Sequence, residues 1–260
     1  MSKHAPASKG SPPGVSGPTY SEELFGKGLY ARHHLARFEW LGRKVEALAD
    51  AAEISVLEVG CHDGRALSYI PRRVRRYAGI DAGWGGGLER GRERFATEQN
   101  YSFIESTNPR DVESLTEKFD FIICMETLEH LDTAVLEQYV HAFAAKLRGF
   151  LLITVPNEKG IPFLVKATGS RVLGIERYYP YTTAEFFWAV LGRLNRVRRI
   201  EHKGFDYARL VSLIRNLFQS VSVEGISPLR LPPSLSLTIG IVASAPECPR
   251  LSSHPPRARG

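Results

Sequence analysis

The sequence predicts a doubly wound α/β domain built around a mostly parallel sheet. Short apolar blocks that are typical of buried strands alternate with segments of helical periodicity. The block FDFIIC at 119–124 is apolar enough to be covered on both faces, as central strands of such sheets are. A loop with glycine at both ends directly follows the first block, and ligands of these folds bind beyond the carboxyl ends of the strands.

The size and composition of the chain fit one such domain. With 260 residues, 43% of them hydrophobic, it can bury one sizeable core. No apolar run approaches the ~18 residues that a membrane span needs, and the N-terminus does not resemble a signal peptide, so we expect a cytoplasmic protein. Three cysteines are too few and too scattered for a disulfide framework or a zinc cluster. The net charge of +6 is modest and leaves an anionic partner open.

The ends of the chain differ from its middle in composition. Residues 1–19 and 246–260 are rich in Pro, Ser and Gly and predict disordered tails. The folded domain is therefore expected over 20–245, and apolar residues at helical spacing predict a leading helix over roughly 21–50. The segment 157–204 is too long for a plain connection and predicts an insert on the substrate side.

Each further element follows from its own local pattern. Asp132 can begin and Gly149 can end a helix between the fourth and fifth strands. Thr182 and Glu185 have the spacing of a capping box, and periodic apolar residues predict a late helix near 210–218. Seven apolar blocks predict strands at 55–59, 77–80, 101–104, 119–124, 150–155, 221–226 and 235–243.

The loop after the first strand is the first candidate site. The stretch 56–64 reads VLEVGCHDG, which places Glu58 just before the loop. Its glycines allow a ligand to approach the backbone, but Glu58 would repel a pyrophosphate, and the G-x-G-x-x-G fingerprint of dinucleotide sites is missing. Asp81, which ends the second strand, is placed to accept hydrogen bonds from a ribose diol. Together these residues favour a nucleoside that carries positive charge, and S-adenosylmethionine fits.

Four motifs, in this order, resemble those of class I S-adenosylmethionine-dependent methyltransferases: VLEVGCHDG, YAGIDAG, FDFIICMETLEHLD and GFLLITVPN. The resemblance covers about 45–245. It implies a Rossmann-like methyltransferase fold with strand order 3-2-1-4-5-7-6, the last strand antiparallel, and S-adenosyl-L-methionine as cofactor. His62 stands where the family usually has a glycine, so its side chain must point away from the ligand or the loop must shift. The implied cofactor-binding residues are Glu58, Gly60, Cys61, Asp63, Gly64, Asp81, Met125 and Glu126.

The segment after the fourth strand is the second candidate site. If it is helical, Glu126, Glu129 and His130 share one face, where they could bind a divalent ion, or His130 could act as a general base. CMETLEHL resembles a block of quinone-biosynthesis O-methyltransferases and the E-x-x-E-H metal site of small-RNA 2′-O-methyltransferases. The latter family has a further histidine where this chain has Arg177. We therefore predict His130 as the catalytic residue and no bound metal. A plain helix entry with acids at its N-terminus is the third interpretation.

The insert 157–204 should select the acceptor. It combines aromatic residues with a basic cluster. These residues could serve single-stranded RNA, an anionic membrane surface or a small acidic or aromatic substrate, or they could be core and solvated surface. We expect a methyltransferase that acts at oxygen on a small-molecule or lipid-linked acceptor, with peripheral membrane contact through 157–204 left open. The alternatives are an RNA 2′-O-methyltransferase-like enzyme, a nicotinamide-dependent oxidoreductase and a non-catalytic cofactor-binding protein. The basic cluster consists of Arg193, Arg196, Arg198, Arg199 and Lys203.

Overall fold

A computed structural model gives the arrangement of most of the chain. It describes residues 29–172, 181–200, 202–227 and 231–245. The expected tails, 1–19 and 246–260, lie outside these ranges, as does the start of the expected leading helix. The part of that helix that is described runs over Leu29–Leu48.

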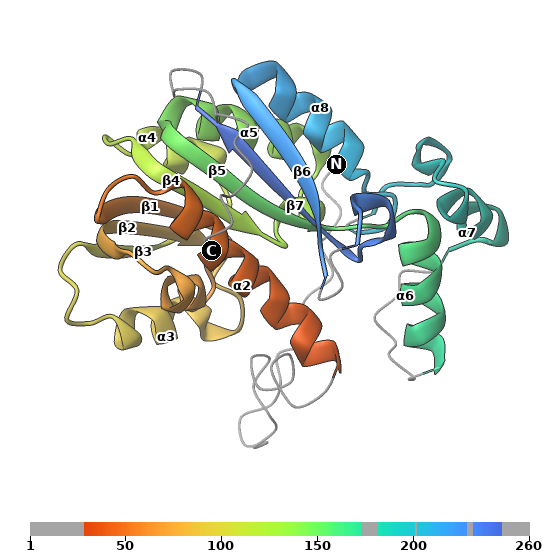
Figure 1. The fold of residues 1–260 in the computed structure, drawn as a ribbon, viewed down its shortest axis with the longest axis horizontal. Coiled ribbons are helices and arrows are strands. Elements are labelled where there is room, and N and C mark those ends of the chain that lie inside the picture. The colour runs from red at the N-terminus through yellow and green to blue at the C-terminus, as the bar shows by residue number, and fades with distance from the viewer. Residues whose placement is uncertain (1–28, 173–180, 201, 228–230, 246–260) are drawn as a thin grey trace, which may run out of the picture.

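A seven-stranded sheet forms the centre of the fold, in the order β3-β2-β1-β4-β5-β7-β6 (Figure 1). The first five strands pair in parallel, and β7 is antiparallel to both of its neighbours. The predicted fold class and strand order are therefore confirmed. The strands are β1 (Glu53–Val59), β2 (Arg73–Asp81), β3 (Tyr101–Glu105), β4 (Phe119–Met125), β5 (Leu147–Pro156), β6 (Ser220–Ile226) and β7 (Thr238–Ser244).

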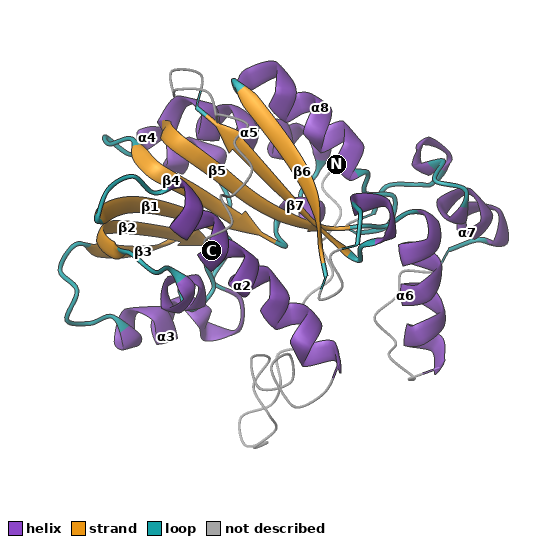
Figure 2. Ribbon diagram, viewed as in Figure 1, coloured by secondary structure: helices purple, strands orange, loops and turns teal. Residues whose placement is uncertain are grey.

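Helices cover both faces of this sheet (Figure 2). One core lies between the sheet and α4, α5 and α8, and the other between the sheet and α2, η1 and α3. Helices α6 and α7 extend beyond the sheet and pack on each other around a small apolar cluster of their own (Figure 1). The α-helices are α2 (Leu29–Leu48), α3 (Gly87–Arg94), α4 (Pro109–Ser114), α5 (Thr133–Lys146), α6 (Gly160–Val172), α7 (Thr183–Val190) and α8 (Tyr207–Leu217). The 3-10 helices are η1 (Arg65–Tyr69), η2 (Trp84–Gly86), η3 (Leu128–His130), η4 (Leu194–Arg196) and η5 (Pro233–Leu235).

Strand β4 shows why its sequence is almost uniformly apolar. Successive side chains of a strand point to opposite faces, so Ile122 enters the core under α5 while Ile123 enters the core under α2. Both are fully buried, and burying one such side chain contributes roughly 1.5–3 kcal/mol. A polar residue at either position would lie in a dry core, which fixes the strand in the middle of the sheet.

Two local expectations for helix ends have different outcomes. The capping box of α7 is confirmed: the Glu185 N–H donates to Thr182 Oγ1, and the Thr182 N–H donates to the Glu185 carboxylate. The expected role of Gly149 is wrong, because α5 ends at Lys146 and β5 begins at once. Gly149 lies inside β5, where a Cβ atom would come within 2.2 Å of the carbonyl oxygen of Asp120 in β4. The glycine permits close strand approach instead of ending the helix.

Candidate cofactor and acceptor site

The register of the sheet brings the predicted site residues to one edge. Val59 in β1 lies opposite Ile80 in β2 and opposite Cys124 in β4, so the three strands end side by side. Chain segments that are far apart in sequence therefore leave the sheet at the same place, where doubly wound folds bind their ligands. The residues that follow this row are Gly60, Asp81 and Met125.

The loop after β1 requires backbone conformations that favour glycine. Gly60 and Gly64 have φ values of 79° and 67°. A Cβ atom on Gly60 would also lie 1.9 Å from Oγ1 of Thr127, so this position is closed to larger residues. His62 has a φ of 48°, and its ring packs on Gly87 at the start of α3, where an added Cβ would lie 2.5 Å from the ring. The unusual histidine is thus accommodated by a strained backbone and a glycine opposite it.

Glu58 belongs to a buried polar cluster beside the loop. The hydroxyl group of Tyr77 donates a hydrogen bond of 2.7 Å to Oε2 of Glu58. Burial raises the pKa of Glu58 to about 8, although the bond from Tyr77 opposes the shift. Burial also raises the pKa of the Cys61 thiol, which is therefore neutral. Because Gly79 has no side chain, the Cys61 sulfur and the Tyr77 hydroxyl can both lie beside it; a Cβ atom there would clash with both. Tyr77 was not predicted as a site residue, because its role depends on a neighbour from another strand.

Asp63 holds the loop to its surroundings. Its Oδ2 accepts from the guanidinium groups of Arg65, at 3.4 Å, and Arg94 of α3, at 3.3 Å. Burial alone would raise the pKa of Asp63, but the His62 ring and the two arginines hold it at about 2. Within the described residues, the carboxylate is therefore neutralised by side chains, and its clearest contribution is to fix the loop against α3.

Asp81 connects the loop after β1 with the loop after β2. Its Oδ2 accepts from the backbone N–H of His62 at 2.9 Å, and its Oδ1 accepts from the N–H of Gly83 at 3.0 Å. Each carboxylate oxygen can accept a second hydrogen bond. The end of β2 thus orients the loop after β1 and still offers acceptors to a ligand.

The segment after β4 differs from the expected helical turn. Met125 ends the strand, and Glu126 has a φ of 50° while its N–H donates to the carbonyl of Thr154. A short 3-10 helix follows, in which Glu129 is fully buried and His130 is exposed. Glu126, Glu129 and His130 therefore do not lie on one α-helical face. Burial raises the pKa of Glu129 well above its usual range, and the carboxylate of Glu126 raises it further.

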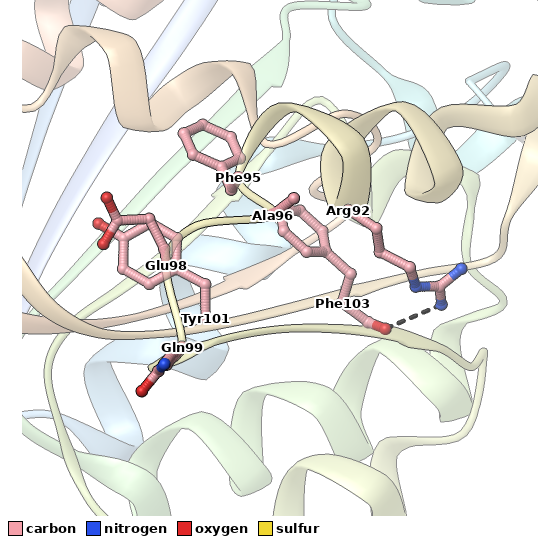
Figure 3. Close-up of a pocket in the computed structure, with 7 residues that line it drawn as sticks. All are labelled: Arg92, Phe95, Ala96, Glu98, Gln99, Tyr101 and Phe103. Carbon is pink, nitrogen blue, oxygen red and sulfur yellow. Dashed lines mark hydrogen bonds between the residues drawn. The ribbon is translucent and has the colours of Figure 1, made fainter.

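A pocket of about 360 Å³ lies elsewhere, between the end of α3 and the start of β3 (Figure 3). Arg92 donates a hydrogen bond of 2.9 Å to the carbonyl of Phe103 at its side. Tyr101 begins β3, so the pocket is near the amino end of that strand, away from the edge at Asp81. Its lining residues are Arg92, Phe95, Ala96, Glu98, Gln99, Tyr101 and Phe103.

Comparison with known families identifies this arrangement. The family described as "Methyltransferase domain" matches residues 31–220, which include β1 to β5 and the loop after β1. The chain belongs to this methyltransferase family. The resemblance to class I S-adenosylmethionine-dependent methyltransferases is thereby confirmed, together with the expected enzyme class and cofactor. The nicotinamide-dependent alternative has no support in this assignment. No curated protein sequence matches the methyltransferase.

Solved structures share the fold of this methyltransferase at low sequence identity. An S-adenosylmethionine-dependent methyltransferase from Clostridium acetobutylicum has a TM-score of 0.56 and 12% identity, over 86% of this chain and 97% of that chain. Magnesium protoporphyrin IX methyltransferase from Synechocystis, with bound SAH, has a TM-score of 0.53 and 14% identity, over 86% and 92%. The N-methyltransferase NodS from Bradyrhizobium japonicum has a TM-score of 0.52 and 15% identity, over 83% and 98%.

The methyltransferase has a further histidine at this edge that the sequence analysis missed. His202 lies in a tight turn between α7 and α8, and its ring meets the ring of His130 edge-on with centroids 4.1 Å apart. Arg199 fixes one end of the turn by donating to the carbonyl of Glu129 at 2.7 Å. Lys203 fixes the other end through an ion pair of 2.8 Å with Glu185, the capping residue of α7. No local pattern marks His202, because its neighbours come from β4 and from the insert.

Proposed function

We propose that the protein transfers the methyl group of S-adenosylmethionine to an oxygen atom of a small-molecule or lipid-linked acceptor. The observation that carries this proposal is the common edge at which β1, β2 and β4 end. The loop from Gly60 to Gly64 would hold the methionine part of the cofactor, and the free acceptor sites of Asp81 would receive the ribose diol. Met125 and Glu126 would form the far wall beyond β4.

His130 is the residue that we assign to the acceptor side. It is exposed, and it follows β4 at the edge where the methyl group must emerge. Methyl transfer aligns an acceptor lone pair with the methyl–sulfur bond, and positioning with desolvation of the cation supplies most of the rate. A hydroxyl acceptor must also lose a proton, and the imidazole of His130 can accept it as a general base.

An exposed apolar stripe supports a lipid-linked acceptor. Ile161, Leu164 and Val165 recur at helical spacing on α6, and Phe187 and Leu191 are exposed on or next to α7. Helices α6 and α7 therefore both present apolar side chains to solvent, beyond the sheet. None of the described helices is long and apolar enough to cross a membrane. Contact with a lipid surface would be peripheral.

The basic residues of the insert favour this acceptor over RNA. Arg196 stacks over Trp188, with the guanidinium carbon 4.3 Å from the ring centroid, and Arg193 approaches the same ring at 5.7 Å. Arg199 and Lys203 bind groups of the protein itself. Trp188 and these cations already have partners within the chain, whereas a single-strand binding surface needs free aromatic faces and free cations.

A methyl-transfer screen tests the proposal. Purified protein and labelled S-adenosylmethionine are incubated with quinone precursors, glycolipids, small RNA and amine acceptors. We expect label in a phenolic or lipid-linked hydroxyl compound, and loss of turnover in His130→Ala with cofactor affinity retained. Transfer to RNA or to an amine alone would contradict the proposed acceptor. Replacing Ile161 and Val165 with serine should reduce binding to anionic vesicles in a sedimentation assay, and replacing the solvent-exposed Glu137 of α5 with serine serves as the control.

A further inference from the structure

The pocket between α3 and β3 has no role in the proposed function. It lies near the amino end of β3, whereas the proposed cofactor contacts lie at the carboxyl edge of the sheet. Its volume of about 360 Å³ is large enough for a small molecule. Aromatic rings line it together with charged and amide groups (Figure 3). The chemistry of these walls determines which ligand the pocket can bind.

Three aromatic rings form the apolar wall of the pocket. Phe95 and Phe103 stack with their ring centroids 6.0 Å apart and 15° between the ring planes, and the Tyr101 ring lies 5.7 Å from that of Phe95. All three side chains are only partly buried, and part of their surface lines the pocket. The face of an aromatic ring carries negative charge density and attracts a cation. This wall therefore suits a ligand that combines an apolar body with a positive charge.

Backbone segments hold the rings from behind. A Cβ atom on Gly91 of α3 would lie 2.6 Å from the ring of Phe103. A Cβ atom on Gly64, in the loop after β1, would lie 3.0 Å from the same ring and 3.1 Å from the ring of Phe95. The Tyr77 ring contacts Phe103 with a centroid distance of 5.4 Å. Because the wall is already fixed, a ligand does not have to order it on binding.

Glu98 supplies the charge that distinguishes this pocket. The guanidinium group of Arg92 donates to the Glu89 carboxylate at 3.3 Å and to the carbonyl of Phe103 at 2.9 Å, so its charge is compensated. The carboxylate of Glu98, in contrast, has no hydrogen bond or ion pair with any residue that the structure describes. Burial raises the pKa of the Tyr101 hydroxyl, and the nearby charge of Glu98 raises it further. The unpaired carboxylate therefore lies beside the aromatic wall.

The basic residues next to the pocket are bound to other acids. Arg73, which lowers the pKa of the same tyrosine, forms an ion pair of 2.9 Å with Glu53. Arg76 donates to the Glu117 carboxylate at 2.7 Å and to the carbonyl that precedes β3 at 3.1 Å. Neither side chain neutralises the lining carboxylate. The local charge of the pocket is therefore negative, which favours a cation over an anion.

We propose that this pocket binds a small organic cation with an aromatic or apolar body. The body would lie against the rings of Phe95 and Phe103, and its ammonium group would lie beside Tyr101 and the carboxylate of Glu98. The amide oxygen of Gln99, which also lines the pocket, can accept a further hydrogen bond from the ammonium group. This site is separate from the cofactor edge and does not depend on the proposed function.

Phenethylamine is a suitable probe, because it is a cation at neutral pH and has a neutral counterpart, 2-phenylethanol, and an anionic one, phenylacetate. Each compound is titrated into the full chain at low salt and followed by ligand-observed NMR. We expect one phenethylamine to bind per chain, with an affinity at least about threefold higher than that of 2-phenylethanol. Added salt should reduce this preference, and phenylacetate should bind more weakly than either compound.

Substitutions locate the probe in the pocket. Glu98→Gln removes the charge of an exposed side chain and should abolish the preference for phenethylamine over 2-phenylethanol. Phe95→Leu keeps an apolar side chain but removes an aromatic face, and should weaken phenethylamine binding about threefold. Glu93→Gln is the matched control, because it removes an exposed carboxylate of α3 that does not line the pocket. Circular dichroism and the Tm verify that each variant is folded, and Glu98→Gln alone decides if Phe95→Leu is not.

Three results would overturn the proposed site. They are the absence of saturable phenethylamine binding, a preference for phenylacetate or for none of the three compounds, and an unchanged preference for the cation in folded Glu98→Gln. Asp81→Asn tests whether the probe binds at the cofactor edge instead. Phenethylamine binding should be unchanged in this variant, and its loss would place the cation at that edge and contradict the pocket.

A separate measurement distinguishes this inference from the proposed function. Binding of S-adenosylhomocysteine is measured by calorimetry on the same wild-type protein. If phenethylamine binds as expected but S-adenosylhomocysteine does not, the pocket stands and the proposed function is wrong. If S-adenosylhomocysteine binds but phenethylamine does not, only the pocket is wrong.

Discussion

Tyr77 of β2 donates a 2.7 Å hydrogen bond to the carboxyl group of Glu58 in β1, and both side chains are buried. The pair explains how a titratable group can sit at the end of a central strand: the hydroxyl satisfies one oxygen, and burial keeps the carboxyl group protonated up to a pKa of about 8. Asp63 and Asp81 lie close enough to raise this pKa further. A cationic ligand that reached the cluster would favour the ionised form.

The first prediction concerns stability and pH. The pKa of Glu58 is raised from 4.5 to about 8 on folding, so its contribution to stability is complete below about pH 4.5 and is lost as the pH rises through 8. We expect the wild type to lose roughly 2–4 kcal/mol more between pH 5 and pH 8 than Glu58→Gln. Urea unfolding at several pH values measures this difference.

Two other carboxyl groups define the control for this comparison. Asp63, with a pKa of about 2, affects stability only at lower pH, where its contribution is lost. Glu129 also has a raised pKa and therefore acts in the same direction as Glu58. The decrease of the free energy of unfolding with pH should thus be smaller in Glu58→Gln than in the wild type, but should not vanish. Identical slopes in both proteins would show that Glu58 does not titrate in this window.

The second prediction separates the cofactor edge from the rest of the sheet. Asp81→Asn removes the charge that orients the His62 and Gly83 N–H groups. We expect the binding free energy for S-adenosylhomocysteine to become less favourable by about 1–3 kcal/mol. Asp120→Asn is the matched control, because Asp120 also accepts a backbone N–H, from Ser55, but at the amino end of β4. Calorimetry should show nearly unchanged affinity in the control. Equal affinity in both variants would remove Asp81 from the binding site.

How far the sequence predicts this structure depends on the range of the interactions. Strand β4 was predicted closely, because burial on both faces requires apolar residues along nearly the whole strand. The end of α5 was missed, because Gly149 is required by Asp120 of the neighbouring strand and not by the helix. The positive φ of Glu126 was missed for a similar reason: its N–H bonds to a carbonyl of β5. Local patterns predict elements, whereas contacts between distant segments must be observed.

The same distinction holds within the candidate site. The sequence indicated Gly60 and Asp81, because glycine and aspartate at strand ends follow from rules of local geometry and ligand chemistry. It could not indicate Tyr77 or His202, which become relevant only through a carboxyl group on another segment. A pattern search near one expected position could not find a histidine that the chain supplies from a different turn.

The third prediction isolates steric overlap from backbone strain. Gly60→Ala places a Cβ 1.9 Å from Thr127 and also adopts a φ of 79°, whereas Gly85→Ala has a φ of 62° with nothing within 4 Å. We expect Gly85→Ala to cost about 1 kcal/mol of stability, from strain alone, and Gly60→Ala to cost more. Gly60→Ala should also weaken S-adenosylhomocysteine binding. Unfolding curves and calorimetry on both variants test this, and equal stability losses would mean that Thr127 moves aside freely.

The last prediction divides the basic cluster of the insert into internal and external members. Arg199 donates to the carbonyls of Glu129 and Leu131, at 2.7 and 3.2 Å, and its guanidinium carbon lies 4.9 Å from the ring centroid of Phe205. Arg193, in contrast, is exposed and makes a distant contact with Trp188.

Removing these two arginines should therefore have different effects. We expect Arg199→Ser to lower the free energy of unfolding by about 1.5–3 kcal/mol, because it removes charge-assisted hydrogen bonds and frees the turn that carries His202. Arg193→Ser should change it by less than about 0.5 kcal/mol, as surface substitutions usually do. Arg199→Lys keeps the charge but not the paired donors, so its loss of unfolding free energy should lie between those of the two serine variants. Denaturant unfolding measures all three, and equal stability of the serine variants would show that the turn at His202 is held without Arg199.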